Sequence, residues 1–538
     1  MLSGRDRTVV SVGVVVLVAV LVRVVGLGTR PFHWDEARVG YWTLRSLETG
    51  SYSYRPVAGG PLVYLLARLA MTLGTASDFL ARLPIALLSG LLPAAALLFR
   101  GRLRDDETVG LALLLAFSPL LLYYGRFLRG DLLAAGAALV AVGFLLRWVD
   151  TDRDGFLYAA TVSAVAALAA SGFAVATLVL VVVAGLFTVD RRRIEGKPVA
   201  AREAIAVRGG WLRERLTPLA RALFVFLGAW AVAFAPRGYG ALSDPVGFLL
   251  ATYRTPVVEF LAVRVSGREG TELLPFLTDA AGTLLATSVV VFALGVAGFL
   301  LDRYEGLPAV ESPRRFVAFA GFWAGLGLIG YPIVAAVTAP WTLVHAIVPM
   351  TVPAAVGLAA LVRYGRRALS REDAARATTA LLVLAVVAGG VGVVALDGVA
   401  GEPAHDDGFS QYGQPVGDLE PLVEELTAAL STSDDDRVVY VGERFHLADE
   451  AAVAHPPITD PDARTAFGER LPLPWYVERT DATSASVADP ADIDGEPAVM
   501  IVDSAHEGTV ADRYPDHETM VVETALYDRE VVVFLDAG

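Results

Sequence analysis

The sequence predicts a polytopic α-helical membrane protein that carries a small α/β domain at its C-terminal end. Of its 538 residues, 55% are hydrophobic and only 19% are charged, and the mean hydropathy is +0.54. The apolar residues gather in runs of about 20, the length that an α-helix needs to cross about 30 Å of hydrocarbon. From residue 401 onward, 18 aspartates and 13 glutamates face seven arginines, a net charge of −24, whereas the first 400 residues carry a net +10. A basic membrane part is therefore joined to a strongly acidic terminal part.

The apolar runs predict about eleven transmembrane helices. They lie near residues 8–28, 80–99, 108–124, 131–148, 156–170, 172–188, 219–235, 281–301, 316–337, 341–362 and 376–396. Arginine collects in short connections at "RDR", "RGRLR", "DRRRIEGK", "ESPRR" and "RYGRR", which all fall on one side of the membrane if the spans number eleven. Because such arginines stay in the cytoplasm, we expect a multi-pass plasma-membrane protein with a cytoplasmic N-terminus and an extracellular C-terminal domain. The first run lacks a small-x-small cleavage site, so we expect it to remain as an uncleaved helix.

Two further segments of the first outer loop are expected to be helical without crossing the membrane. Tyr41, Leu44 and Leu47 are spaced like one face of a helix, which predicts a helix in the plane of the interface. The segment "GGPLVYLLARLAMTLG" that follows is apolar but too short to span, so it is predicted to be interfacial or re-entrant.

The domain boundaries follow from these patterns. Residues 1–396 are predicted to form the transmembrane domain, 397–415 a linker and 416–538 the acidic extracytoplasmic α/β domain. In this last part "DLEPLVEELTAAL" and "EGTVADRY" predict helices, and "RVVYVGE", "AVMIVDS" and "TMVVETALYDREVVVFLD" predict strands. The dense acidity, with Lys197 as the single lysine, is typical of a salt-loving (halophilic) organism and argues against nucleic-acid binding, because it repels phosphate. The absence of cysteine excludes disulfides and thiolate metal sites.

An adjacent acid pair, Asp35 and Glu36, lies in "RPFHWDEARVGYWTLRSLETG", where the chain leaves its first span. An acid at the membrane interface stays ionised and suits a general base that takes a proton from a hydroxyl. It also suits a ligand for a hard divalent cation such as Mg²⁺ or Mn²⁺. The alternative is that the pair only begins the interfacial helix, where the helix dipole favours negative charge.

A second polar group, "YYGRFLRGD", lies in a short outer turn and contains Arg126, Arg129 and Asp131. Arginines on the outer side run against the positive-inside tendency, and guanidinium groups bind phosphate with two parallel hydrogen bonds. The alternative is an aromatic belt with arginines that reach for the headgroups. His345, near the end of a later span, is either a satisfied core residue or a donor to a pyrophosphate or sugar. P-loop, HExxH, zinc and dinucleotide motifs are missing, so nothing supports ATP-driven transport.

The succession of "HWDEARVGYWTLRSL", "GGPLVYLLARLAMTLG" and "DFLARLPIALLSGLLPAAALL" resembles the start of the GT-C membrane glycosyltransferases. These include the dolichyl-phosphate-mannose–protein mannosyltransferases and the lipid A aminoarabinose transferases. The resemblance covers roughly residues 8–148, and "YYGRFLRGD" resembles the second outward turn of those families. With "LPLPWYVER" (471–479), the architecture is most similar to an archaeal, mannosyltransferase-like subgroup associated with lipid-linked oligosaccharide flipping in protein N-glycosylation.

The resemblance implies inverting transfer of a sugar from a polyprenyl (dolichyl) phosphate to an acceptor hydroxyl on the outer face. Asp35 would be the catalytic base, and Glu36 would support it or hold a metal. The implied substrate-binding residues are His33, Arg126, Arg129, Asp131 and His345. Implied partners are the polyprenyl-phosphate-linked sugar, membrane lipid and other glycosylation proteins. The alternatives are a non-catalytic, flippase-associated protein that binds or presents the same lipid-linked oligosaccharide, and a sensor whose outer domain binds a ligand.

Overall fold

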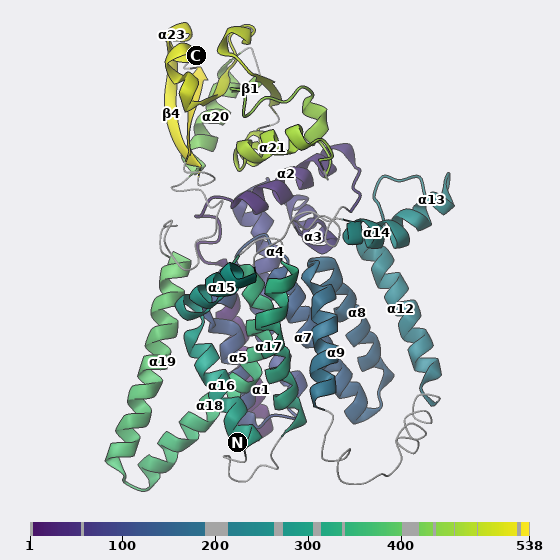
Figure 1. Ribbon diagram of the computed structural model, residues 1–538, viewed down its shortest axis with the longest axis vertical. Coiled ribbons are helices and arrows are strands. Elements are labelled where there is room, and N and C mark those ends of the chain that lie inside the picture. Colours follow the sequence, from purple (N-terminus) through teal and green to yellow (C-terminus); the bar gives the residue numbers. More distant parts are fainter. Residues whose placement is uncertain are drawn as a thin grey trace.

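The computed structural model describes residues 4–54, 59–188, 214–262, 273–304, 314–335, 339–400, 419–433, 437–456, 458–480, 482–524 and 529–536. A bundle of long helices carries a mixed α/β domain at one end, and the N-terminal helix begins at the opposite end (Figure 1). Two stretches of interest lie outside the described residues: 401–415 of the predicted linker and the arginine-rich connection at 190–197.

The helices of the bundle follow the order of the apolar runs. They are α1 (Gly4–Val24), α4 (Asp78–Leu91) with the 3-10 helix η1 (Leu92–Phe99), α5 (Asp105–Phe117) with α6 (Pro119–Tyr124), α7 (Asp131–Thr151), α8 (Asp154–Ala170), α9 (Phe173–Phe187), α12 (Leu216–Phe234), α15 (Leu273–Thr287) with α16 (Val289–Arg303), α17 (Arg315–Val334), α18 (Trp341–Ser370) and α19 (Ala374–Ala400). Each predicted run is thus one helix or two consecutive helices.

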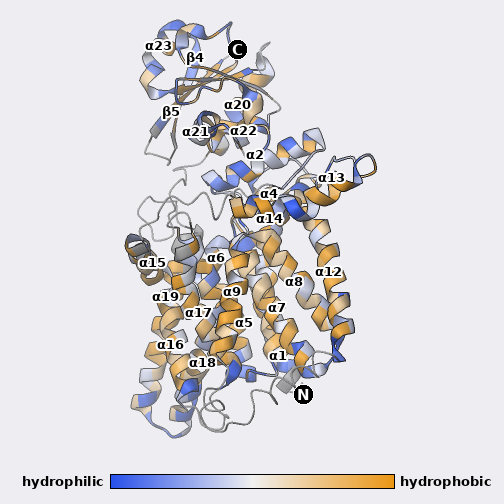
Figure 2. Ribbon diagram, turned by 45° about the vertical axis from the view of Figure 1, so that its right-hand side comes forward, coloured by the Kyte–Doolittle hydropathy of each residue, from blue (hydrophilic) through white to orange (hydrophobic). Residues whose placement is uncertain are grey.

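Within the described ranges, six helices are long and apolar enough to cross a membrane. The number is seven if α15 and α16, which meet at 94°, form one broken span, and four further helices are apolar but shorter. The bundle is largely hydrophobic along its length, whereas hydrophilic residues gather in the C-terminal domain (Figure 2). A multi-pass membrane protein is therefore confirmed, while the count of eleven crossings stays a prediction.

Two helices lie between the bundle and the C-terminal domain. These are α2 (Trp34–Thr49), which runs across the end of the bundle, and α3 (Pro61–Met71) beneath it (Figure 1). Both are helical where the sequence predicts non-spanning helices. A second connection at this end contains α13 (Pro245–Leu249), the π-helical turn η2 (Leu250–Arg254) and α14 (Thr255–Leu261).

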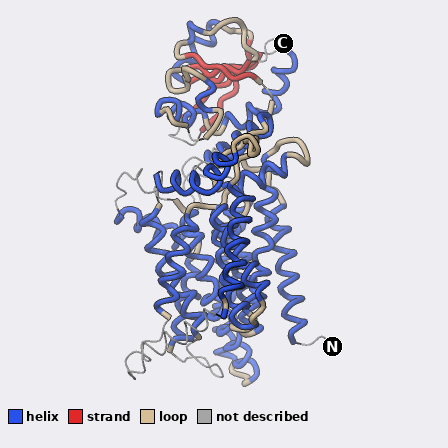
Figure 3. Tube along the Cα trace, turned by 90° about the vertical axis from the view of Figure 1, so that its right-hand side faces the viewer, coloured by secondary structure: helices blue, strands red, loops and turns tan. Residues whose placement is uncertain are grey.

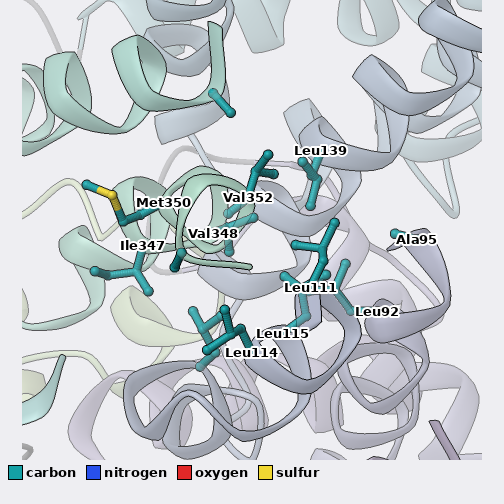
Figure 4. Packing of buried hydrophobic residues seen from close by; sticks show 14 of the residues in the cluster. Leu92, Ala95, Leu111, Leu114, Leu115, Leu139, Ile347, Val348, Met350 and Val352 are labelled. Carbon is teal, nitrogen blue, oxygen red and sulfur yellow. The ribbon is translucent and has the colours of Figure 1, made fainter. Parts of the chain in front are cut away.

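Helix α18 lies at the centre of the bundle. It packs against α16, α17, α5 and α7, and 89% of its apolar window is buried. Figure 4 shows Val348 and Val352 of α18 on the side of Leu111 and Leu115 of α5, and all four belong to one buried cluster. Because α18 is held by helices on several sides, a polar residue near its first turn has a fixed position relative to α7 and α9.

A partly buried ion network joins four helices at the end of the bundle opposite the C-terminal domain. Arg314 donates from Nη1 to Glu107 (2.6 Å) and from Nε to Asp302 (2.6 Å). Arg363 of α18 donates to Asp106 of α5 (2.6 Å). Because these ion pairs tie α5, α16 and α18 to the start of α17, they fix the spacing of these helices at this end of the bundle.

The C-terminal domain is a five-stranded mixed sheet of order β2-β1-β3-β5-β4 (Figure 3). The strands are β1 (Arg437–Val441), β2 (Thr483–Val487), β3 (Val499–Asp503), β4 (His517–Thr524) and β5 (Arg529–Asp536). Strand β1 pairs in parallel with β2 and β3, and β5 pairs antiparallel with β3 and β4. The helices are α20 (Glu420–Thr432), α21 (Pro461–Arg470), α22 (Leu473–Glu478) and α23 (Glu507–Arg513). The predicted α/β domain is confirmed, whereas β2, with the weakly hydrophobic sequence "TSASV", escaped prediction.

Alternate residues of the strands face two separate cores, as the pleat of a sheet requires. On β1, Val438 and Tyr440 belong to a core shared with α20, α21 and α22, while Val439 and Val441 belong to a core shared with α23. The first of these cores continues into α2 and α3 of the membrane part. The C-terminal domain is therefore packed on the outer helices through a common apolar core.

Candidate functional site

Helix α2 begins immediately after His33, whose side chain caps the helix. His33 Nδ1 accepts the backbone N–H of Asp35 (3.0 Å), and the Glu36 carboxylate accepts the backbone N–H of His33 (3.0 Å). This reciprocal arrangement is a capping box, which satisfies donors that have no partner inside the helix. The predicted site residue His33 is thus engaged in fixing the first turn of α2 and the two acids in it.

Glu36 is fully buried and forms an ion pair with Arg82 of α4. Arg82 Nε and Nη2 donate to the two carboxylate oxygens at 2.8 and 2.6 Å, and the backbone N–H of Leu128 donates to one of them at 2.6 Å. Burial raises the pKa of Glu36, but Arg82 and the backbone donors outweigh it and hold the pKa below its ordinary value. Because every carboxylate oxygen is used, Glu36 joins α2, α4 and the turn after α6 and is not available to a substrate.

Asp35 lies beside two arginines. One oxygen of its carboxylate accepts from Arg38, one turn along α2, and the other accepts from Arg129 in the turn between α6 and α7. Burial raises the pKa of Asp35, but Arg38 and Arg129 reverse this effect and hold the pKa below its usual range. Asp35 is therefore ionised at neutral pH, and the stability from these contacts is lost only as the pH falls through that lowered pKa.

Arg129 links Asp35 to a second acid. Its Nε donates to Asp131 (3.1 Å), and its guanidinium lies 3.9 Å from the ring centre of Trp341. The other oxygen of Asp131 lies 3.4 Å from His345 Nε2 on α18. A continuous polar chain, Asp35–Arg129–Asp131–His345, thus crosses from α2 to the central helix and brings together four of the predicted site residues.

His345 is buried against two aromatic rings, which also contact each other. The ring centres of Phe173 and Tyr331 lie 5.2 and 5.1 Å from the imidazole, and among the described residues Nδ1 has no hydrogen-bond partner. The hydroxyl of Tyr331 is hydrogen-bonded to that of Thr177 on α9 (2.8 Å). The imidazole therefore ends the polar chain inside the bundle, with one nitrogen that lacks a protein partner.

The turn that carries Arg129 packs closely against the backbone at the end of α8. A Cβ atom at Gly130 would lie 1.8 Å from the carbonyl oxygen of Ala170, so only glycine fits here. The neighbouring Ser171 donates its hydroxyl to Asp131 (3.3 Å). The turn before α7 is thus pressed against the end of α8, which fixes the direction of Arg129.

Arg126 does not join this group. Its guanidinium donates to the carbonyl oxygens of Val22 (2.8 Å), Val25 (2.7 Å) and Gly26 (2.7 Å), at and just beyond the end of α1, where carbonyl groups lack partners inside the helix. The structure therefore separates the two arginines of "YYGRFLRGD". Arg126 thus caps α1 in this structure, and its role in binding phosphate stays a prediction.

The acid pair does not fit a divalent cation in this arrangement. The oxygens of Asp35 and Glu36 face guanidinium groups, which compete with a cation for the same lone pairs. Within the described residues, no group of three or more histidine or acidic side chains gathers as a metal site would need. The positive charge at this site is supplied by arginine.

Sequence reasoning missed three residues of the site. Arg82 lies in the apolar run at 80–99, and an ionisable residue inside such a run is itself a signal of a specific partner. Arg38 follows Asp35 by three residues, a spacing that brings helical side chains together. Trp341 gave no such signal, because its stacking on Arg129 depends on the packing of α18 against α7.

The C-terminal domain rests directly on α2. Phe467 of α21 packs against Tyr41 and Trp42, with ring centres 5.2 and 5.6 Å apart, and Trp42 Nε1 donates to the carbonyl oxygen of Val453 (2.9 Å). Farther along α2, Arg45 donates to Glu478 of the domain (3.2 Å) and to Glu48 (3.0 Å). One arginine therefore serves two acids at the far end of the interface.

The stability of the folded protein is expected to depend on pH through Glu478, which shares Arg45 with Glu48. Burial and the nearby Glu48 raise the pKa of Glu478 to about 7, although Arg45 opposes the shift. The folded state then holds an extra proton between about pH 4.5 and 7, so the folded protein loses stability as the pH rises through this window. Glu478→Gln is expected to remove this slope and to raise stability at pH 8 by roughly 1–3 kcal/mol. Thermal unfolding at a series of pH values tests this, with Glu424→Gln on exposed α20 as the control; an unchanged slope in Glu478→Gln contradicts it.

Comparisons with known proteins agree with this architecture. Residues 419–536 match the family model described as the Agl23 flippase-associated protein C-terminal domain. The whole chain is similar to ArnT from Cupriavidus metallidurans bound to undecaprenyl phosphate, with a TM-score of 0.57 and 16% identity over 97% of each chain. It is also similar to the archaeal oligosaccharyltransferase AglB from Archaeoglobus fulgidus, in complex with an inhibitory peptide and a dolichol-phosphate. There the TM-score is 0.51 and the identity 13%, over 98% of this chain and 74% of AglB. No curated protein matches the sequence.

These similarities confirm the predicted GT-C-like fold. Both solved structures align over at least 97% of this chain, and residues 419–536 match the Agl23 flippase-associated model.

Proposed function

We propose that the protein transfers a sugar from a polyprenyl (dolichyl) phosphate to an acceptor hydroxyl at the outer face of the plasma membrane. The observation that carries this proposal is the contact of Asp35 on α2 with Arg129 in the turn before α7, 94 residues away in the sequence, where the bundle ends. A base and a phosphate-binding cation are the two groups that this reaction requires at the depth of a lipid headgroup. The undecaprenyl phosphate and the dolichol-phosphate bound to ArnT and AglB support the same class of lipid.

The contacts of Arg129 suggest how binding and chemistry are coupled. A lipid phosphate that engages Arg129 and Arg38 competes with Asp35 for their N–H groups. As the arginines turn to the phosphate, they stabilise the Asp35 carboxylate less, and Asp35 becomes a stronger base. Asp131 remains beside Arg129 and keeps the guanidinium in place.

The bonds change in one displacement. The acceptor oxygen attacks the anomeric carbon, and the bond from that carbon to the phosphate oxygen breaks. The electron pair leaves on the polyprenyl phosphate, where Arg129 meets its growing negative charge. The hydroxyl proton passes to Asp35, and the anomeric configuration inverts.

An apolar cavity of about 240 Å³ lies between α7, α8 and α9, with Phe226 of α12 at its side. Ala164 and Ala167 line the cavity with small side chains. The cavity holds on the order of eight methylene-sized groups if each takes about the volume of a water molecule. Thr177 lines the cavity and is also hydrogen-bonded to Tyr331, next to His345. This position supports the placement of part of an isoprenoid chain below the phosphate.

Filling this cavity is expected to weaken binding of the lipid. Ala164→Phe places a ring where the chain would lie and should raise the Kd for polyprenyl monophosphate several-fold, because the ring displaces close-packed contacts. Val162→Phe adds the same ring on the lipid-facing side of α8, where Val162 is 47% exposed, and should leave the Kd unchanged. Binding of a fluorescent polyprenyl monophosphate to the protein in nanodiscs measures both; equal affinities would remove the cavity from the proposal.

The match of residues 419–536 favours one second candidate, a non-catalytic flippase-associated protein that presents a lipid-linked oligosaccharide. A comparison of surface glycans with and without the protein separates the two functions. Loss of a single sugar supports transfer, whereas loss of the entire glycan supports flipping. In either case we propose that the N-terminus is cytoplasmic, that the C-terminal domain is extracellular, and that other glycosylation proteins act beside it.

A further inference from the structure

We infer that the C-terminal domain is a positioning part of the transfer site, which acts through Trp475 and Tyr476 on the start of α2. The inference rests on the proposed function and assigns the domain a task within it. The two residues lie on α22, about 440 residues along the chain from Asp35, yet both reach the segment that leads into α2.

Both residues hold the same buried acid of the membrane part. Trp475 Nε1 donates to one oxygen of Asp78 (2.7 Å), and the Tyr476 hydroxyl donates to the other (2.9 Å). Asp78 is the first residue of α4 and is 4% exposed, so its charge depends on these donors and on Arg479 at 3.5 Å. The domain is therefore anchored to α4 by a polar contact inside the apolar core.

The same two side chains contact Phe32, just before α2. The Tyr476 oxygen accepts the backbone N–H of Phe32 (2.9 Å), and the Trp475 ring stacks on the Phe32 ring with centres 4.8 Å apart and planes 12° apart. A Cβ atom at Gly40 would lie 2.6 Å from the Trp475 ring, so the indole also lies directly on α2. Trp475 thus touches the chain on both sides of Asp35.

Helix α4 also contacts the residues that lead into α2, through Arg82. Arg82, one turn after Asp78, donates to the carbonyl oxygens of Arg30 (2.6 Å) and Pro31 (3.1 Å) and binds Glu36. Residues 30–36 are therefore fixed from below by Arg82 and from above by Trp475 and Tyr476. Asp35 lies within this segment, so its distance to Arg129 depends on the C-terminal domain.

Two matched substitutions separate positioning from mere docking. Trp475→Phe and Trp42→Phe each remove one indole N–H that crosses the same interface. Trp42, however, lies two turns after Asp35 on α2 and donates to Val453. Trp475 and Tyr476 are called the clamp here, because both contact Phe32 and Asp78. Tyr476→Phe is a second clamp variant and removes only a hydroxyl. The readouts are hydrogen exchange of residues 32–38 in the full-length protein and the kcat and KM of sugar transfer.

Trp475→Phe and Tyr476→Phe are expected to speed exchange at residues 32–38 by about tenfold, the effect of losing a buried hydrogen bond. The kcat should fall about as much, while KM for the polyprenyl-phosphate sugar rises by less than kcat falls, because Arg129 lies outside α2 and only Arg38 loosens with the segment. Trp42→Phe should change neither readout. Unchanged exchange in both clamp variants, or faster exchange with unchanged kcat, overturns the inference. A wild-type protein without transfer activity overturns the proposed function instead, and the exchange comparison still decides whether the domain holds residues 32–38.

Discussion

Replacing Asp35 by asparagine is expected to lower sugar transfer by about 10²–10⁴-fold, the usual contribution of a general base. Asparagine has nearly the same shape as aspartate but cannot take up the proton of the acceptor. Binding of polyprenyl monophosphate should become tighter, because Arg38 and Arg129 lose the carboxylate that competes with phosphate. A transfer assay and a binding assay on the same purified variant therefore move in opposite directions.

Glu48→Gln is the control for this experiment. Glu48 lies on α2 as Asp35 does, but its side chain is 43% exposed and bonded to Arg45 at the far end of the helix. Transfer should stay at the wild-type rate in this variant. Undiminished transfer by Asp35→Asn would remove Asp35 as the base and leave the non-catalytic function as the better account.

Much of the fold was predictable because apolar run length and strand patterning report directly on burial. All eleven runs are helical, and four of the five strands of the sheet fall where alternating or continuous apolar residues predict them. The packing of the C-terminal domain on α2 was not predictable. It depends on Trp475 and Tyr476 reaching Asp78, and a contact across about 400 residues leaves no periodic signal in the sequence.

The site was predictable in part for a similar reason. Unusual charges at the predicted outer end of the spans identified Asp35, Arg129 and Asp131, which do meet. The same reasoning grouped Arg126 with Arg129, because sequence spacing does not show that Arg126 lies over the carbonyl groups that end α1. Composition also treats neighbouring acids as equivalent, although successive positions on a helix point about 100° apart and meet different partners.

The two adjacent acids are therefore expected to respond to substitution in different ways. Glu36→Gln leaves Arg82 buried without its counter-charge, and breaking such a pair costs about 3–5 kcal/mol of stability. Asp35→Asn should cost far less, because Arg129 keeps Asp131 as a partner. Chemical unfolding of the detergent-solubilised variants, followed by tryptophan fluorescence, measures this contrast.

A double-mutant cycle shows that the loss belongs to the ion pair and not to residue 36 alone. Arg82→Met by itself should also be strongly destabilising, since Glu36 would then be a buried unpaired carboxylate. Glu36→Gln combined with Arg82→Met removes both charges and should be more stable than the sum of the two single losses predicts. Additive losses would mean that Arg82 is not the essential partner of Glu36. A Glu36→Gln variant that unfolds like the wild type but no longer transfers sugar would mean that Glu36 acts in the chemistry.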